Sequence, residues 1–166
     1  MSKQVADQYE NMSIYLILSL RGAEPGFHWG IFVPTATPKG WVWHAVNRAG
    51  GWRLEIKETS GVPTSMSLCL AIKVGVVGNW EKFNNTLAAV PSQGQPSAIT
   101  EEAFTCRVWT KDALHALHTA KIIKLLKSIA DIEKEAITAA EANRSAVETG
   151  SNSARVVNDT GYSAPS

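Results

Sequence analysis

Short apolar runs alternate with turn-forming residues through the first half of the chain. Five runs have the length and the β-branched and aromatic content of strands: residues 13–20, 27–33, 41–46, 52–57 and 68–77. Proline and glycine in residues 25–26, 34–40 and 49–51 supply the backbone conformations that reverse a chain. The pattern therefore predicts an antiparallel sheet of about five strands, in which the second to fourth runs pair as a meander.

Helical spacing begins after the fifth run. Residues 79–90 place apolar side chains three or four positions apart, and Pro91 follows them; these side chains are Trp80, Phe83, Leu87 and Val90. This spacing predicts one short amphipathic helix. Residues 92–100 are rich in Ser, Gln, Gly and Pro, so we expect a loop there and consider it the best candidate for a mobile lid or hinge.

Residues 105–149 contain neither glycine nor proline and are rich in helix-forming side chains, which predicts one long helix or two abutting helices. Their apolar residues recur with the a and d spacing of a coiled coil, at Ile122, Leu125, Ile129, Ile132, Ala136 and Ala139. We interpret this spacing first as a helix packed on its own domain and second as the seam of a homodimer. The expected fold class is α+β, with an antiparallel sheet packed with helices and a long C-terminal helix.

Length and composition indicate one globular unit, because 166 residues with 45% apolar content can bury a single core. We divide the chain into a flexible N-terminus at 1–12, an α+β domain at 13–121, a helical extension at 122–149 and a disordered polar tail at 150–166. The 16 Lys and Arg residues nearly balance the 15 Asp and Glu residues, so we expect no nucleic-acid partner.

Cellular location and cofactors are constrained by what the sequence lacks. The apolar stretch at 14–20 is too short for an integral membrane segment or a signal-peptide core, and we expect a cytoplasmic protein. Two cysteines, Cys69 and Cys106, cannot form a disulfide framework. No CxxC or HExxH motif is present, and His115 and His118 lack a third ligand, so neither a metal site nor another cofactor is expected.

Cys106 is the strongest candidate for chemistry. Thr105 is a suitable helix N-cap, which would place Cys106 in the first turn, where unpaired N–H groups and the helix dipole favour a thiolate and can bind an oxyanion. A cysteine nucleophile also needs a base, and His28 and His44 lie inside predicted strands, in FHWGIF and WVWHAV. Neighbouring strands can place both imidazoles on one face. Each residue alone is typical of a core, but together they indicate a Cys-His-His catalytic site.

Other polar and sulfur-bearing residues have simpler interpretations. Cys69 has apolar neighbours in SLCLAIKV and is interpreted as a buried structural thiol. Glu55 or Arg53, on the fourth run, could add a polar contact to His44. Arg107 either holds an anionic substrate or pairs with one of the glutamates at positions 101 and 102.

The order of these motifs resembles the lecithin retinol acyltransferase-like proteins, a permuted branch of the papain-like thiol enzymes. The resemblance rests on FHWGIF, VWHAV and TCRVWTKDAL and covers roughly residues 27–117. It implies a permuted papain-like domain at 13–121, with His28 as base, His44 as the histidine that orients it, and Cys106 as the nucleophile that forms an acyl-enzyme. The TCRVW box differs from the Asn-Cys-Glu-His-Phe type box of familiar members and is closer to small uncharacterised fungal proteins with a CRxW box.

The function expected from these residues is a cysteine-dependent hydrolase or acyltransferase acting on a small hydrophobic or acyl substrate. Its binding residues are predicted to be Trp29, Trp43, Arg107 and Trp109, because aromatic side chains commonly line such pockets. One alternative is a non-hydrolytic cyclase or isomerase of secondary metabolism that uses the same pocket. Another is a non-catalytic interaction module whose long C-terminal helix binds a partner.

Overall fold

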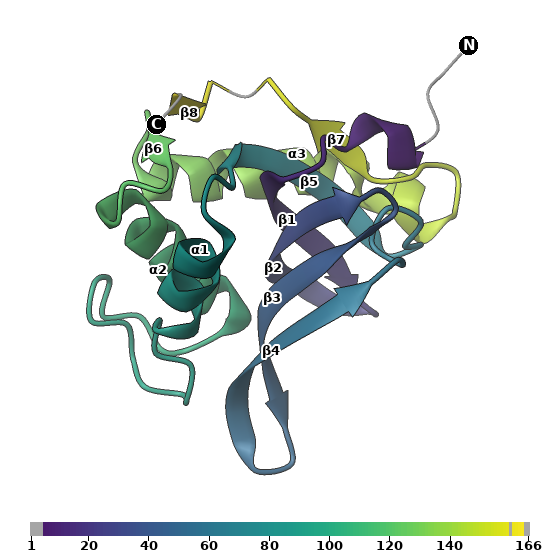
Figure 1. The fold of residues 1–166 in the computed structure, drawn as a ribbon. Helices are drawn as coiled ribbons and strands as arrows, with labels where there is room; N and C mark the ends of the chain where they lie inside the picture. Colours follow the sequence, from purple (N-terminus) through teal and green to yellow (C-terminus); the bar gives the residue numbers. More distant parts are fainter. Residues whose placement is uncertain (1–4, 160, 165–166) are drawn as a thin grey trace.

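A mixed sheet of six strands organises the protein, which a computed structural model describes over residues 5–159 and 161–164 (Figure 1). The spatial order is β4-β3-β2-β1-β5-β7. Its strands are β1 (Ser13–Arg21), β2 (Glu24–Ala36), β3 (Lys39–Arg48), β4 (Gly51–Thr59), β5 (Leu68–Val76) and β7 (Arg155–Val157). Neighbours among β1 to β5 are antiparallel, which confirms the predicted sheet, whereas β7 pairs with β5 in parallel.

Three α-helices complete the α+β fold: α1 (Trp80–Ala88), α2 (Cys106–Thr119) and α3 (Ile129–Glu148). A short 3-10 helix, η1 (Val5–Gln8), precedes the sheet, and β6 (Lys124–Leu125) pairs with β8 (Ser163–Ala164). The predicted helix at 79–90 is confirmed by α1. Residues 105–149 form two helices that are not abutting, because the chain leaves α2 through Lys121, whose φ of 61° is not helical.

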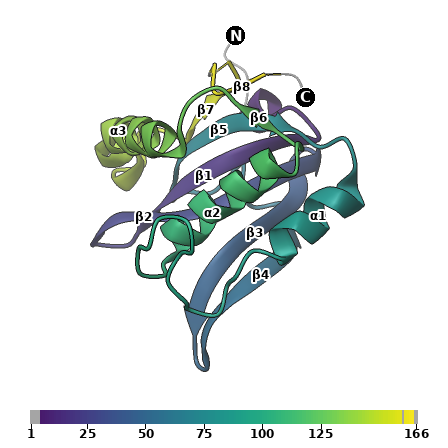
Figure 2. The same cartoon turned by 90° about the vertical axis from the view of Figure 1, so that its left-hand side faces the viewer.

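Helices α1 and α2 cover one face of the sheet, and α3 lies along β5 (Figures 1 and 2). Alternate residues of the strands face these helices and form the main core, among them Leu16, Leu18, Phe27, Trp29, Ile31 and Leu70. Strand residues of the opposite parity, including Tyr15, Ile17, Phe32 and Val42, form a smaller cluster on the other face, which Tyr9 joins from the segment before β1. This alternation decides on which face each candidate site residue lies.

The C-terminal helix packs on its own domain. Ile132, Ala136 and Ala140 are spaced by four residues along α3 and are fully buried in the main core. Ile122 and Leu125 precede α3, so the a and d spacing does not run along a single helix. The first interpretation of this segment therefore fits the structure, and a homodimer seam stays a prediction.

The described parts of both terminal segments, within residues 5–12 and 150–164, contain structure that the sequence did not predict. Within the predicted disordered tail, Arg155–Val157 form β7 and satisfy backbone groups along the edge of β5. Within the predicted flexible N-terminus, Tyr9 packs edge-on against the rings of Tyr15 and Phe32. Residues 1–4, 160, 165 and 166 lie outside the described part of the chain. In the part that is described, none of the helices has the length and apolar character needed to span a bilayer.

Candidate active site

Cys106 is the first residue of α2, as the sequence predicts. Thr105 caps the helix, and its Oγ1 accepts a hydrogen bond from Val108 N at 3.1 Å. The Cys106 sulfur lies 3.5 Å from Trp29 N, which donates to it, and 4.0 Å from Phe27 O. The pairing of β2 with β3 begins at Ile31↔Trp43. The sulfur therefore contacts a part of β2 that does not pair with β3. Its two contacts flank His28 in the sequence.

A pocket of about 350 Å³ opens at Cys106 and is lined by residues from five elements. Aromatic walls come from β2 and β4: Phe27, Trp29 and Trp52. Arg107 lines the pocket on the α2 side, and Ile137 and Glu141 line it on the α3 side. Trp29 and Arg107, which are predicted to bind substrate, therefore both line the pocket that contains the sulfur. Trp52 was not predicted as a binding residue, since nothing local in its run relates it to residue 106.

Helix α3 forms one wall of the pocket because it is attached on both sides of Ile137 and Glu141. On one side, Glu133 binds Arg107 and Lys111 of α2. On the other, the Arg144 guanidinium lies 4.4 Å from the centre of the Phe27 ring and donates to Gly26 O at 2.7 Å. Residues 133, 137, 141 and 144 share one helical face, so these contacts hold the two lining side chains over the pocket.

Trp43 and Trp109, predicted as substrate-binding residues, are not among the side chains that line this pocket, and both are fully buried in the main core. Trp43 packs against Trp80 and Phe83 and donates Nε1 to Asn84 Oδ1 at 2.9 Å. Trp109 lies one turn after Cys106, on the face of α2 that meets the sheet. The physical reason is packing, because large aromatic side chains at these positions fill the space between helix and sheet.

His28, His44 and Glu55 form a hydrogen-bonded chain across three strands. His28 Nε2 lies 2.7 Å from His44 Nδ1, and His44 Nε2 lies 2.8 Å from Glu55 Oε1. Arg48 binds the other Glu55 oxygen at 3.0 Å. Gly30 allows this approach, because a Cβ at this position would lie 3.2 Å from the Cβ of His44. The predicted placement of both imidazoles on one face is confirmed, and Glu55 rather than Arg53 contacts His44.

The charges in this chain assign its protons. The hydrogen bond from His44 lowers the pKa of Glu55, so the carboxylate is ionised at neutral pH and accepts from His44 Nε2. Burial lowers the pKa of His44, so its neutral ring accepts at Nδ1 from His28 Nε2. Burial, with the nearby charges of His44 and Arg21, lowers the pKa of His28 to about 4. This assignment leaves His28 Nδ1 as an unprotonated acceptor.

The Cys106 sulfur and the His28 imidazole do not lie on the same side of β2. Phe27 and Trp29 pack with Cys106 in the main core, and strand alternation turns the side chain between them, His28, to the other face. Within residues 5–159 and 161–164, no hydrogen bond joins the Cys106 sulfur to either histidine. The structure thus brings His28 and His44 together and places the sulfur beside the backbone that carries His28.

Four charged side chains surround the start of α2. Lys111 binds Glu102 at 2.5 Å and Glu133 at 3.2 Å, and Arg107 binds Glu102 at 2.9 Å and also contacts Glu133. Hydrogen bonds from Lys111 and Arg107 lower the pKa of Glu102 to about 2. The predicted pairing of Arg107 with Glu102 is confirmed, and Glu133 is a second partner that sequence spacing alone could not identify.

The remaining histidines stand apart from this site. His118 lies on α2, where its Nδ1 accepts from Leu125 N at 3.1 Å, and His115 is exposed on the same helix. Over the residues that the structure describes, no group of three or more His, Cys, Asp or Glu side chains could hold a metal ion. Neither histidine approaches a third side chain with metal-binding geometry in this part of the chain.

Comparison with known proteins places the chain in a family. No curated protein sequence and no solved structure matches it. The sequence model of one family matches residues 14–124, which is more than half of the 166 residues. The matched segment contains His28, His44, Glu55 and Cys106 and leaves α3 outside. The chain therefore belongs to the family of unknown function DUF6540.

Proposed function

We propose that this protein is a cysteine-dependent hydrolase or acyltransferase, with Cys106 as the nucleophile and His28 as its base. The observation that supports this most directly is the hydrogen-bonded chain from Glu55 through His44 to His28, which orients the His28 ring on the strand segment that contacts the Cys106 sulfur. His44 and Glu55 would act as positioning residues, because they fix the tautomer and the direction of the His28 ring.

The proposed reaction has two halves. His28 Nδ1 takes the Cys106 proton, and the thiolate attacks the carbonyl carbon of an acyl or amide substrate. The Cys106 and Arg107 amides, in the first turn of α2, can receive the oxyanion, whereas the Val108 amide already bonds Thr105. The His28 imidazolium then returns its proton to the leaving group, and water or a second acceptor releases the acyl group from sulfur. The His28 ring lies on the other face of β2 and, in the part of the chain that the structure describes, has no hydrogen bond to the sulfur, so proton transfer requires the strand segment at His28 to rearrange when substrate binds.

The pocket favours a neutral, apolar acyl group. Phe27, Trp29, Trp52 and Ile137 supply apolar surface, and a volume of about 350 Å³ suits a small substrate. Its charged lining residues already have partners: Arg21 with Glu24, Arg107 with two glutamates, and Glu141 with Arg144. A charged substrate would therefore have to compete with existing ion pairs, because no charged side chain among the described lining residues lacks a partner.

A second candidate function is favoured by the independence of the histidine chain from the cysteine. His28, His44 and Glu55 are linked without any bond to the sulfur, so His28 could act as a general base directly on a bound molecule. In that case the protein is a small-molecule cyclase or isomerase of secondary metabolism. Replacement of Cys106 by Ser would then be tolerated, whereas loss of the His28 ring would not.

Covalent trapping tests the proposal and separates the two candidates. Purified protein is incubated with p-nitrophenyl acetate or p-nitrophenyl octanoate, and the acyl adduct is located by intact-mass and peptide mass spectrometry. We expect an adduct at Cys106 in the wild type and in the matched control Cys69→Ala, and none in Cys106→Ala. His28→Gln should slow its formation. An adduct at Cys69, or no adduct at all, would contradict the thiol mechanism, and the latter would favour the cyclase or isomerase.

A further inference from the structure

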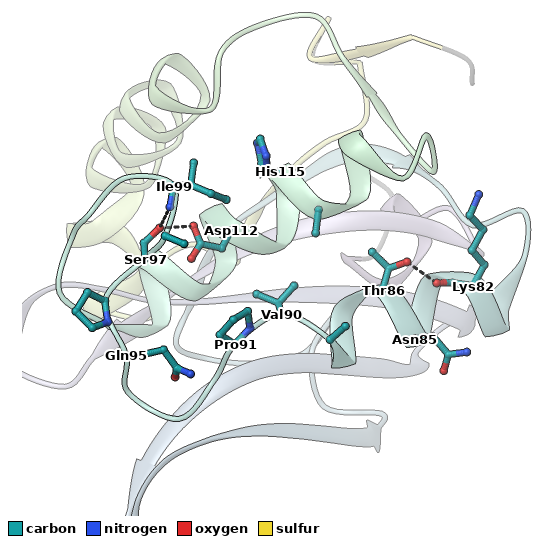
Figure 3. Close-up of a pocket in the computed structure, with 14 residues that line it drawn as sticks. Lys82, Asn85, Thr86, Val90, Pro91, Gln95, Ser97, Ile99, Asp112 and His115 are labelled. Carbon is teal, nitrogen blue, oxygen red and sulfur yellow. Dashed lines mark hydrogen bonds between the residues drawn. The ribbon is translucent and has the colours of Figure 1, made fainter.

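A second and larger pocket lies on another side of α2, with a volume of about 670 Å³ (Figure 3). It is lined by residues of α1, of the middle of α2 and of the connection between these helices, which includes the loop at 92–100. None of its lining residues also lines the Cys106 pocket. It is therefore a separate cavity, of the size that proteins use for small molecules.

The walls of this pocket are mainly apolar. Val90, Pro91 and Ile99 from the connection face Ala116 of α2 across it. Ile99 is 51% exposed, which is unusual for an isoleucine that could be buried in the core. Apolar surface in a concavity of this size contributes binding free energy when a ligand removes it from water. The body of a fitting ligand is thus hydrophobic.

One carboxylate stands in this apolar pocket in a fixed orientation. The Ser97 hydroxyl accepts hydrogen bonds from Ile99 N at 3.1 Å and Thr100 N at 3.0 Å, so its own hydrogen is free to point at Asp112. It donates to Asp112 Oδ1 at 2.8 Å. Ser97 is buried, and Figure 3 shows the pair with the second Asp112 oxygen directed away from the serine. The loop thereby holds the carboxylate in one rotamer.

Asp112 has no cationic partner within residues 5–159 and 161–164. The neighbouring ammonium, Lys111, is committed to Glu102 and Glu133. His115 also lines the pocket, and its charge lowers the pKa of Asp112 less than burial raises it. Lys82 lies at the far end of the pocket from Asp112 (Figure 3). The two ends of the cavity therefore differ in charge, and among the described residues neither the Asp112 carboxylate nor the Lys82 ammonium forms an ion pair.

We propose that this pocket binds a small hydrophobic molecule that carries a protonated amine, with the amine hydrogen-bonded to Asp112. An ammonium group satisfies the second carboxylate oxygen and compensates its charge, and a charge-assisted bond of this kind is stronger than a neutral one. Lys82 orients the ligand, because it repels the cationic end from the opposite side of the cavity. The apolar body would then cover Val90, Ile99 and Ala116.

Three nearly isosteric probes test the proposal with the full-length protein: 4-phenylbutylamine, 4-phenylbutanol and 4-phenylbutanoate. Each is titrated at pH 7.5 into ¹⁵N-labelled protein, and amide shifts in α1, α2 and residues 89–100 are followed by NMR. We expect the amine to bind about tenfold more tightly than the alcohol, because a hydrogen bond between two charged groups is stronger than a neutral one even after desolvation offsets part of it. The carboxylate should bind most weakly.

Asp112→Asn is nearly isosteric and should remove the preference for the amine while alcohol binding stays unchanged. Asp131→Asn, on an exposed turn of α3, is the matched control and should behave as the wild type. Ala116→Leu should weaken all three probes by filling the cavity. The proposal is overturned if Asp112→Asn binds the amine as the wild type does, if the alcohol binds as tightly as the amine, or if no probe shifts these amides.

Discussion

Two polar clusters lie near Cys106 and differ in how completely they are satisfied. In the quartet of Glu102, Arg107, Lys111 and Glu133, each cation binds both carboxylates. In the chain of His28, His44 and Glu55, the two hydrogen bonds together use one ring nitrogen of His28 and both of His44, which leaves His28 Nδ1 without a partner in this chain. A complete cluster can stabilise the fold, whereas a cluster with one available acceptor can also take a proton.

The pKa shifts of the two clusters support the same distinction. The quartet lowers the pKa of Glu102 to about 2, which keeps its charge at every physiological pH. The histidine chain lowers the pKa of His28 to about 4, which keeps an uncharged, proton-accepting ring at neutral pH. The quartet joins α2 to α3 and so fixes one wall of the pocket, while the histidine chain carries the proposed chemistry.

The largest expected effect is the loss of the proton acceptor. His28→Gln should slow acylation of Cys106 by p-nitrophenyl octanoate by about 10²–10³-fold, the usual range for removing a general base. Burst amplitude and rate at pH 7.5 give the measurement. His118→Gln, an exposed histidine on α2, is the control and should retain the wild-type rate. Equal rates in both variants would remove His28 from the mechanism.

Breaking the quartet should act on stability instead. Lys111→Met leaves Glu102 and Glu133 each with one cation, and because the lysine is 8% exposed we expect a loss of about 2 kcal/mol in unfolding free energy. Urea denaturation at pH 7 measures this loss. Lys39→Met breaks an exposed pair with Glu58 and should cost less than about 0.5 kcal/mol. Similar losses in the two variants would mean that the quartet is not a stabilising unit.

Weakening the far end of the histidine chain should have an intermediate effect on activity. Glu55→Gln removes the carboxylate that orients His44, and we expect acylation to slow by about tenfold, as for other outer-shell partners. Glu58→Gln on the same strand provides the comparison. A rate unchanged in Glu55→Gln would show that His28 does not depend on its two positioning residues.

The two clusters should also lose their contributions to stability in different pH ranges. His28 has a lowered pKa in the folded state, so the unfolded chain binds its proton first, and stability should fall by roughly 2–3 kcal/mol as pH decreases from 6.5 to 4. His44 acts in the same direction. Glu102 is protonated only at lower pH, so its stabilisation should be lost between about pH 4.5 and 2.

Urea denaturation of the wild type, His28→Gln and Lys111→Met across this range checks the two windows. His28→Gln should reduce the pH dependence of the unfolding free energy between pH 6.5 and 4 only. Lys111→Met should reduce it between about pH 4.5 and 2 only. If His28→Gln leaves the upper window unchanged, the ring is not held neutral by its surroundings.

The smallest expected effect concerns Ile137, in the pocket wall that the quartet holds in place. Ile137→Ala enlarges the pocket by removing apolar side-chain volume. The ratio of the Cys106 alkylation rate with the bulky N-benzyl iodoacetamide to that with iodoacetamide should therefore rise about threefold, because only the bulky reagent needs the extra space. Peptide mass spectrometry gives both rates. Thr138→Ala, one residue away on the exposed side of α3, should keep the wild-type ratio, and a shift of equal size in both would contradict a pocket wall at Ile137.

Some features of the site were predictable because they depend on neighbouring residues. Thr105 and the apolar spacing after it predict a helix that begins at Cys106, since capping involves only one turn. Strand alternation and short turns predict that His28 and His44 can share a face. Trp43 and Trp109 were placed wrongly in the pocket, because aromatic content does not say whether a side chain packs between helix and sheet or lines a cavity.

By itself, the sequence determined an antiparallel sheet of about five strands with a meander through the second to fourth, the start of α2 and the residue types of a Cys-His-His site, because alternation, turn chemistry and capping act over a few residues. Only the tertiary structure decided that Glu55 completes the histidine chain, that α3 supplies Ile137 and Glu141 to the Cys106 pocket, and that the chain end adds a parallel strand. It also decided on which side of β2 the sulfur and the His28 ring lie. These outcomes depend on register and on contacts between residues far apart in the chain, which local patterns do not encode.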